Sequence, residues 1–182
     1  ITLTAKVKIS DASDATVFDE SNANFNILGG FTVTAPNGSE VWTVNESRNI
    51  TWTTAGTVAN VKLEYSTDGG TTYPNVIIAT TPNNNTYAWT IPDNISNGVR
   101  VKVSDTTNAD AFDTSNTNFK IRGSLTVAAP NGAEAWAINS TQSITWTKVG
   151  SIANVKLEYS TNGFTDELQT FLIIASANAT TG

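Results

Sequence analysis

Residues 31–70 read FTVTAPNGSEVWTVNESRNITWTTAGTVANVKLEYSTDGG, and residues 125–164 read LTVAAPNGAEAWAINSTQSITWTKVGSIANVKLEYSTNGF. The two stretches lie 94 residues apart, and 24 of their 40 aligned positions are identical. The same offset aligns residues 5–30 with residues 99–124, where 13 of 26 positions are identical. The 182 residues therefore contain a repeat of about 94 residues, which is the size of one small domain.

The repeats are out of phase with the two ends of the sequence. Residues 1–30 correspond to the C-terminal strands of one Ig-like repeat and are possible donor strands, whereas residues 31–124 form a complete repeat. Residues 125–182 correspond to the N-terminal part of a further repeat. That last copy contains no counterpart of the stretch TYAWTIP at residues 86–92, so we expect it to lack its last strands.

Within a repeat, apolar and polar residues alternate with a period of two. In the run VKLEYS at residues 61–66, for example, Val, Leu and Tyr alternate with Lys, Glu and Ser. Turn-forming stretches such as PNG at 36–38 and DGG at 68–70 separate the runs. This alternation predicts about seven half-buried strands in each repeat. We expect an all-β fold of tandem immunoglobulin- or fibronectin III-like β-sandwiches.

The composition excludes several classes of function. The chain has no Cys and no His, so it can build neither a disulfide framework, nor a Cys/His zinc site, nor a Ser-His-Asp nucleophile. Its net charge of −6 disfavours nucleic acid as a partner, because the phosphate backbone requires a positively charged surface. No run of 18 apolar residues predicts a membrane span. We expect a protein that is not an enzyme.

Four motifs carry a resemblance to a known family: PNGSEVW at 36–42, ITW at 50–52, VKLEYSTDGG at 61–70 and YAWTIP at 87–92. They resemble the bacterial surface repeat of the Ser-Thr-rich glycosylphosphatidylinositol-anchored membrane family, and the resemblance covers nearly the whole chain. It implies an Ig-like module of a secreted or cell-surface protein, with an extracellular location. It implies no catalytic residue.

Acidic loops near residues 11–20 and 105–113 are candidate calcium sites, because closely spaced carboxylate oxygens suit a hard cation. The spacing differs from that of an EF-hand, and Asp side chains also cap turns, which is the favoured interpretation. No cofactor is therefore expected, with calcium as the alternative. Phe18 and Phe112 are expected to tuck these loops onto the sandwich. The candidate metal ligands are Asp11, Asp14, Asp19, Asp105, Asp110 and Asp113.

Tryptophans raise the question of sugar binding. Trp52, Trp89 and Trp146 lie in alternating strands and are predicted to be core residues. Trp42 and Trp136 follow the PNG turn and are candidates for stacking on sugar rings, with packing over a sheet edge as the alternative. Stacking on sugar rings would imply a surface polysaccharide as the partner.

Seven Asn-x-Ser/Thr sequons fit a glycosylated surface protein. The chain contains 21 Asn and 45 Ser or Thr residues, so about five sequons are expected from composition alone. The candidate glycosylation sites are Asn37, Asn45, Asn49, Asn84, Asn94, Asn139 and Asn178.

The phase of the repeats predicts the partner. An incomplete sandwich exposes an unpaired strand edge and invites strands from another chain. A molecule that carries the first strands at one end and the last strands at the other can complete its neighbour head to tail, which builds an open-ended filament. The simpler interpretation, which is the favoured one, is that the 182 residues are part of a longer tandem array in which each sandwich is completed by its own chain.

We therefore expect a self-assembling structural protein of an extracellular fibre, filament or stalk, whose partners are copies of itself or neighbouring repeats. A carbohydrate-binding or adhesion module and an accessory region of a large secreted hydrolase remain open as alternatives.

Overall fold

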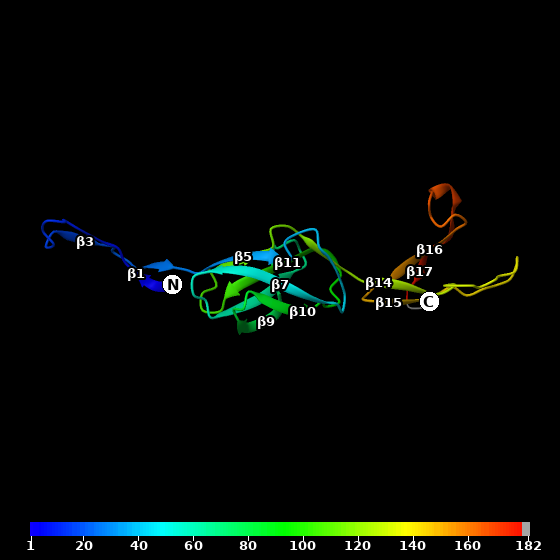
Figure 1. Cartoon of the computed structure of the whole chain (residues 1–182), viewed down its shortest axis with the longest axis horizontal. Coiled ribbons are helices and arrows are strands. Elements are labelled where there is room, and N and C mark those ends of the chain that lie inside the picture. The colour runs from blue at the N-terminus through cyan, green and yellow to red at the C-terminus, as the bar shows by residue number, and fades with distance from the viewer. Residues whose placement is uncertain (180–182) are drawn as a thin grey trace. The chain divides into compact units, whose positions relative to one another are not determined.

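The computed structural model describes residues 1–179, which form seventeen strands and one short 3-10 helix, η1 (Glu167–Gln169) (Figure 1). The fold class is all-β, as the alternating sequence predicted. Among the described residues, no helix has the length and apolar character needed to cross a membrane. The chain divides into two compact units, which are described separately: residues 1–40, 47–89 and 96–120 form the first, and residues 41–46, 90–95 and 121 onward form the second.

The first sheet of the complete repeat has three strands in the order β10-β7-β5. They span Gly30–Ala35 (β5), Ser47–Ala55 (β7) and Thr86–Thr90 (β10). β5 and β7 are antiparallel, and Val33 lies opposite Trp52. This register places both apolar side chains on one face, because side chains alternate between the two faces of a strand.

The second sheet of the complete repeat has six strands in the order β6-β13-β11-β8-β9, with β12 beside β11. Val101 on β11 lies opposite Tyr65 on β8, and Val103 lies opposite Leu63, so the apolar positions of the two strands share a face. The strands span Val41–Thr43 (β6), Asn60–Ser66 (β8), Asn75–Pro82 (β9), Ser96–Asp105 (β11), Phe112–Thr114 (β12) and Phe119–Arg122 (β13).

Both sheets contribute to the core of the first unit. Burial of one Val, Leu, Ile or Phe side chain in this core stabilises the fold by about 1.5–3 kcal/mol. The indole N–H of Trp52 donates to Asn83 Oδ1 at 2.8 Å, which satisfies the one polar atom of that ring. Trp52 and Trp89 are buried, as predicted, whereas Trp146 is only partly buried. The almost completely buried core residues are Val33, Ile50, Trp52, Val61, Leu63, Val99, Val101, Val103 and Phe119.

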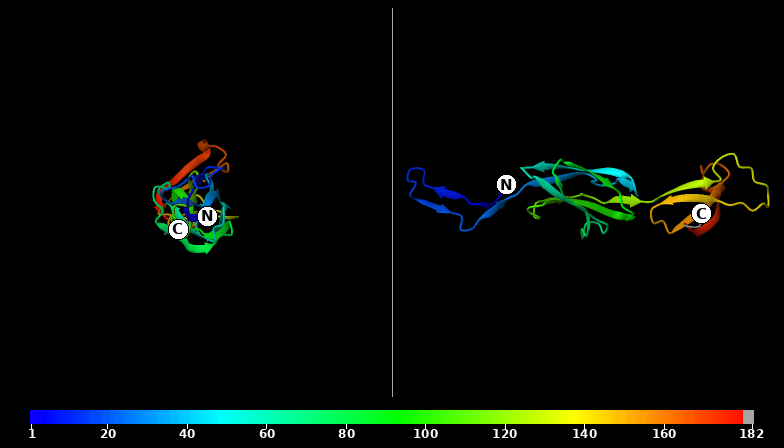
Figure 2. Two further views of the ribbon diagram at one scale, coloured as in Figure 1. Left: turned by 90° about the vertical axis from the view of Figure 1, so that its left-hand side faces the viewer. Right: turned by 90° about the horizontal axis from the view of Figure 1, so that it is seen from below.

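The N-terminal segment, residues 1–30, forms two short antiparallel ribbons, drawn in blue in Figure 2. β1 (Thr2–Ala5) pairs with β4 (Phe25–Ile27), and β2 (Lys8–Ser10) pairs with β3 (Phe18–Glu20). These strands occupy the positions that β11, β12 and β13 occupy in the complete repeat.

The C-terminal segment, described for residues 125–179, contains two antiparallel pairs in the second unit. β14 (Ser124–Ala129) pairs with β15 (Thr145–Val149), and β16 (Asn154–Ser160) pairs with β17 (Thr170–Asn178). Val127 lies opposite Trp146, which reproduces the register of Val33 and Trp52. The segment thus repeats the pairings of β5 with β7 and of β8 with β9.

Candidate functional site

An open apolar cavity of about 740 Å³ lies in the C-terminal segment. Its wall contains the counterparts of four core residues of the complete repeat: Val127, Ile144, Leu157 and Tyr159. In the complete repeat the corresponding side chains are at most 6% exposed, namely Val33, Ile50, Leu63 and Tyr65. Val127 and Tyr159, in contrast, are each 50% exposed. The cavity is therefore the apolar face that the complete repeat keeps inside its core.

The N-terminal segment shows the same contrast. Val7 and Ile9 are 59% and 72% exposed, although their counterparts Val101 and Val103 are completely buried. Phe25 is 43% exposed, and its counterpart Phe119 is 1% exposed. An exposed apolar group of this kind is typical of an interaction surface.

In the complete repeat, polar bonds tie β12 and the residues after it to β5 and the loop that follows β5. The backbone N–H of Val33 donates to Asp113 Oδ2 at 2.7 Å. The hydroxyl of the fully buried Ser115 donates to the carbonyl of Pro36 at 2.7 Å and accepts from the N–H of Val101 at 3.0 Å. These bonds satisfy main-chain groups that would be costly to bury unpaired.

Two further hydrogen bonds and a close approach complete this contact. The N–H of Asn116 donates to Asn37 Oδ1 at 2.6 Å, and the hydroxyl of Thr117 donates to the carbonyl of Asn37 at 3.2 Å. Gly38 has a φ of +136°, and a Cβ at this position would overlap the Thr117 side chain. We use the name polar latch for the three bonds of Asp113, Ser115 and Asn116 to Val33, Pro36 and Asn37.

The Glu of the PNG-x-E motif shapes the loop that the latch engages. The N–H groups of Asn37 and Gly38 donate to the carboxylate of Glu40 at 2.9 and 2.7 Å. The spacing of Asn, Gly and Glu is therefore explained by one carboxylate that accepts two consecutive main-chain N–H groups.

The candidate calcium ligands hold turns in the structure. Asp11 Oδ1 accepts from the N–H and hydroxyl of Ser13 at 2.8 and 2.7 Å, and Asp14 accepts likewise from Thr16. The Ser13 hydroxyl bond is the main cause that lowers the pKa of Asp11, and the Thr16 hydroxyl lowers that of Asp14.

The acidic loop of the complete repeat, residues 105–113, follows the same pattern. Asp105 accepts from the N–H and hydroxyl of Thr107, each at 2.7 Å, and the N–H of Asp110 donates to Asn108. Asp113 belongs to the polar latch, and Asp19 is exposed at the matching position of the N-terminal segment. Residues 1–179 contain no group of three or more acidic side chains placed to hold a metal ion.

The expectation that Phe18 and Phe112 tuck their loops onto the sandwich is wrong. Both rings are about half exposed. The ammonium of Lys8 lies 3.7 Å from the Phe18 ring centroid, and that of Lys102 lies 4.4 Å from the Phe112 centroid. The rings therefore make cation–π contacts on the outer face.

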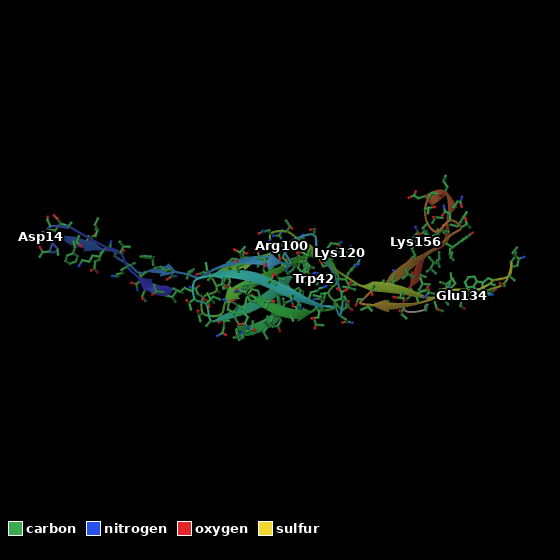
Figure 3. The ribbon with its side chains drawn as sticks, in the orientation of Figure 1. Asp14, Trp42, Arg100, Lys120, Glu134 and Lys156 are labelled. Atoms are coloured by element: carbon green, nitrogen blue, oxygen red, sulfur yellow. The ribbon has the colours of Figure 1, made fainter. Side chains whose placement is uncertain are left out.

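The two candidate sugar-stacking residues differ in exposure. Trp42 on β6 is buried, so little of its ring face is free (Figure 3). Trp136 is 44% exposed and lies in the wall of the cavity. Its surroundings, residues 135–137, are not a strand, although the equivalent residues 41–43 form β6.

Most sequon asparagines are accessible. Asn45, Asn49, Asn84, Asn94, Asn139 and Asn178 are exposed. The Thr of the Asn178 sequon, residue 180, lies outside the described residues. Asn37 is half-buried, and its side-chain oxygen accepts a bond of the polar latch.

Asp93 holds a turn in the second unit. Its carboxylate accepts from the N–H of Ser151 at 2.8 Å and from the Ser151 hydroxyl at 2.5 Å. The hydroxyl bond is the main cause that lowers the pKa of Asp93. The neighbouring Gly150 has a φ of +87°, which favours glycine.

Comparisons of this chain with protein-family models, with curated proteins and with solved structures gave no match.

Proposed function

We propose that the chain is a non-enzymatic structural segment of an extracellular fibre, filament or stalk, built from immunoglobulin-like β-sandwiches. In such an assembly, strands of a neighbouring copy or repeat complete each partial sandwich. One observation carries the proposal. The apolar positions that are buried in residues 31–124 are exposed in residues 1–30 and line an open cavity in residues 125–179.

The energetics favour covering both surfaces. Transfer of one Val, Ile or Phe side chain from water to a core contributes about 1.5–3 kcal/mol. The N-terminal segment exposes four such side chains at positions that the complete repeat buries: Val7, Ile9, Phe25 and Ile27. Insertion of these side chains into the cavity of the C-terminal segment would reproduce the core of the complete repeat.

Two further observations support a secreted or cell-surface location. The motifs resemble those of the Ser-Thr-rich glycosylphosphatidylinositol-anchored membrane family, whose repeats are extracellular modules. Six of the seven sequon asparagines are also accessible to a glycan.

Self-association of the 182-residue chain tests the proposal. Sedimentation velocity over a range of concentrations, with electron microscopy of the largest species, should show growing linear oligomers. Ile9→Asp, which places a charge on the exposed apolar face, should abolish this growth. Val76→Asp is the matched control, because Val76 is similarly exposed but lies on β9 of the complete repeat. A wild-type chain that stays monomeric at every concentration contradicts the proposal.

The exposed Trp136 favours one second candidate, a carbohydrate-binding module. The ring lies in the cavity wall, where an aromatic face can stack on a sugar. Titration of tryptophan fluorescence with soluble polysaccharides should then show quenching in the wild type and none in Trp136→Ala. No change across a broad set of glycans would eliminate this candidate.

A further inference from the structure

We propose that a second copy of the polar latch specifies the contact between molecules. In this contact, the donor residues Asp19, Ser21 and Asn22 of one molecule bind an acceptor loop in another copy of the chain. The acceptor loop presents the N–H of Val127, the carbonyl of Pro130 and the side chain of Asn131. The inference rests on the proposed function, because it names the residues through which one partial repeat recognises the other.

All six positions of the latch keep their residue type. Asp113, Ser115 and Asn116 correspond to Asp19, Ser21 and Asn22. The acceptors Val33, Pro36 and Asn37 correspond to Val127, Pro130 and Asn131. These six residues are preserved although only 13 of 26 positions in the surrounding donor alignment are identical. Thr117, which also donates to Asn37, is replaced by Ala23, so that additional bond has no counterpart.

The acceptor loop keeps the two carboxylate bonds of the loop in the complete repeat, although Gly132 and Ala133 lack the positive φ of Gly38 and Ser39. The N–H groups of Asn131 and Gly132 donate to Glu134 at 2.9 and 2.8 Å, and the corresponding bonds to Glu40 are 2.9 and 2.7 Å. Glu134 lies in this loop, labelled in Figure 3. The bonds to Glu134 restrict the loop before docking, which reduces the entropic cost of association, and docking then needs a backbone change at Gly132 and Ala133.

The donor residues are also in place. Ser21 Oγ accepts from the N–H of Val7 at 3.0 Å, as Ser115 Oγ accepts from the N–H of Val101 at 3.0 Å. The hydroxyl of Ser21 donates to the carbonyl of Val7 at 3.2 Å, whereas that of Ser115 donates to Pro36. Rotation of one hydroxyl is enough to redirect this bond to an acceptor loop.

The strand that carries Asp19 has the required register. Asp19 lies opposite Ile9 in the pairing of β3 with β2, and Asp113 lies opposite Val103 in the pairing of β12 with β11. The side chain of Asp19 therefore occupies the position, relative to its own ribbon, from which Asp113 reaches the N–H of Val33.

A second copy is the occupant that the structure favours. Within the complete repeat the latch is closed by its own residues, so neither half of that latch is available to a partner. The remaining donor and the remaining acceptor belong to different segments, and every copy of the chain carries one of each. Contact between unlike surfaces of identical molecules is the heterologous type that extends without closing.

Cross-linking of single-cysteine variants tests the inference, and the chain contains no native cysteine that would interfere. In the complete repeat the N–H of Ser39 donates to the carbonyl of Asn118 at 3.3 Å. The corresponding positions are Ala133 and Asn24, and neither side chain belongs to the latch. An equimolar mixture of Asn24→Cys and Ala133→Cys, treated with a short thiol cross-linker, should give a covalent heterodimer. Ser13→Cys replaces Asn24→Cys in the control mixture, which should give none.

The latch itself is tested by Asp19→Ala combined with Ser21→Ala in the Asn24→Cys chain. Loss of these bonds should weaken association, and with it the cross-linked yield, by roughly tenfold to a hundredfold. The matched variant Asp14→Ala removes a turn carboxylate outside the latch and should keep the wild-type yield. The unfolding midpoint of the complete repeat should be the same in all variants, which reports that each is folded.

The outcomes separate the two proposals. A wild-type chain that associates, but gives no heterodimer or keeps its full yield without Asp19 and Ser21, overturns the latch and leaves the structural function standing. Cross-links found only within one molecule of an Asn24→Cys/Ala133→Cys double variant also overturn the contact between copies. A chain that does not associate at all overturns both.

Discussion

Residues 1–27 and residues 95–121 have the same local hydrogen bonds but opposite burial. The N–H of Ser21 donates to the carbonyl of Val7 at 2.9 Å, and the N–H of Ser115 donates to that of Val101 at 3.0 Å. Val101 is nevertheless buried, and Val7 is exposed. The comparison teaches that the ribbon forms from its own sequence, whereas its core face depends on a sheet that packs against it.

The outer faces of the two regions do not differ. Phe18 and Phe112 are similarly exposed, and each ring lies under a lysine ammonium. The difference between the regions is therefore confined to the apolar face, which packs against a second sheet in residues 95–121 and is exposed in residues 1–27. Three pairs of substitutions and one acid titration break or sharpen this comparison, beginning with the largest expected effect.

Phe119→Ala should destabilise the complete repeat by about 3–5 kcal/mol, because it removes a fully buried aromatic ring. The equivalent Phe25→Ala should change the free energy of unfolding much less, since Phe25 is 43% exposed and Phe119 only 1%. Urea unfolding monitored by tryptophan fluorescence measures both. Equal destabilisation by the two variants would show that the N-terminal segment already has a packed core.

Ser115→Ala should cost about 1–3 kcal/mol, because the carbonyl of Pro36 and the N–H of Val101 lose their partner inside the core. Ser21→Ala should not change the free energy of unfolding and should weaken only the association of copies. The same urea titration, run beside sedimentation velocity, separates the two effects. A stable Ser115→Ala variant would contradict the structural role of the latch.

Acid should disorder the acceptor loop. The N–H of Asn131 is the main cause that stabilises the carboxylate of Glu134 and lowers its pKa, followed by the N–H of Glu134 itself and that of Gly132. A lowered pKa means that the loop is fully stabilised above the ordinary range of a glutamate and loses this stabilisation as the pH falls through the lowered value. The amide chemical shifts of both residues, followed by NMR, should move in that acid range.

Glu134→Gln supplies the control for this titration. The amide side chain carries no charge at any of these pH values, so the shifts of Asn131 and Gly132 should lose their acid transition. A transition that persists in this variant would have to come from another group.

Asp93→Ala should have the smallest effect, confined to the turn at Gly150 and Ser151. The substitution removes the acceptor of the Ser151 N–H, so hydrogen exchange at that amide should become faster. Asp14→Ala removes an equivalent exposed turn carboxylate elsewhere and should leave exchange at Ser151 unchanged. Unaltered exchange in Asp93→Ala would show that another group holds this turn.

Sequence alone was enough for the longer strands and for much of the core, whereas the short strands β6 and β12 were not predicted. Alternation in VKLEYS predicted that Val61, Leu63 and Tyr65 point inward, and all three are buried. These features depend on short-range patterns, which a period of two makes visible.

The polar latch could not be predicted in the same way. Asp113 was considered as a calcium ligand on the basis of its neighbours in the sequence, but it accepts from Val33, which lies 80 residues away. Local spacing contains no information about such a partner. The sequence contained one signal of the latch: Asp19, Ser21 and Asn22 are identical to Asp113, Ser115 and Asn116, although half of the residues in that segment differ.

The local sequence pattern also could not predict how exposed equivalent motif positions are. Trp42 and Trp136 occupy the same place in PNG-x-E-x-W, yet one ring is buried and the other is half exposed. The motif predicts the loop, whereas the residues that cover the ring come from other parts of a complete repeat.

The polar latch has a consequence for how the proposed assembly of this chain would grow. The end that presents an acceptor loop would differ chemically from the end that presents a donor ribbon, so such an assembly would have a direction. Addition at the two ends would proceed at different rates. A molecule that keeps its loop but has lost its donor residues could join only one of the two ends, where it would act as a terminator.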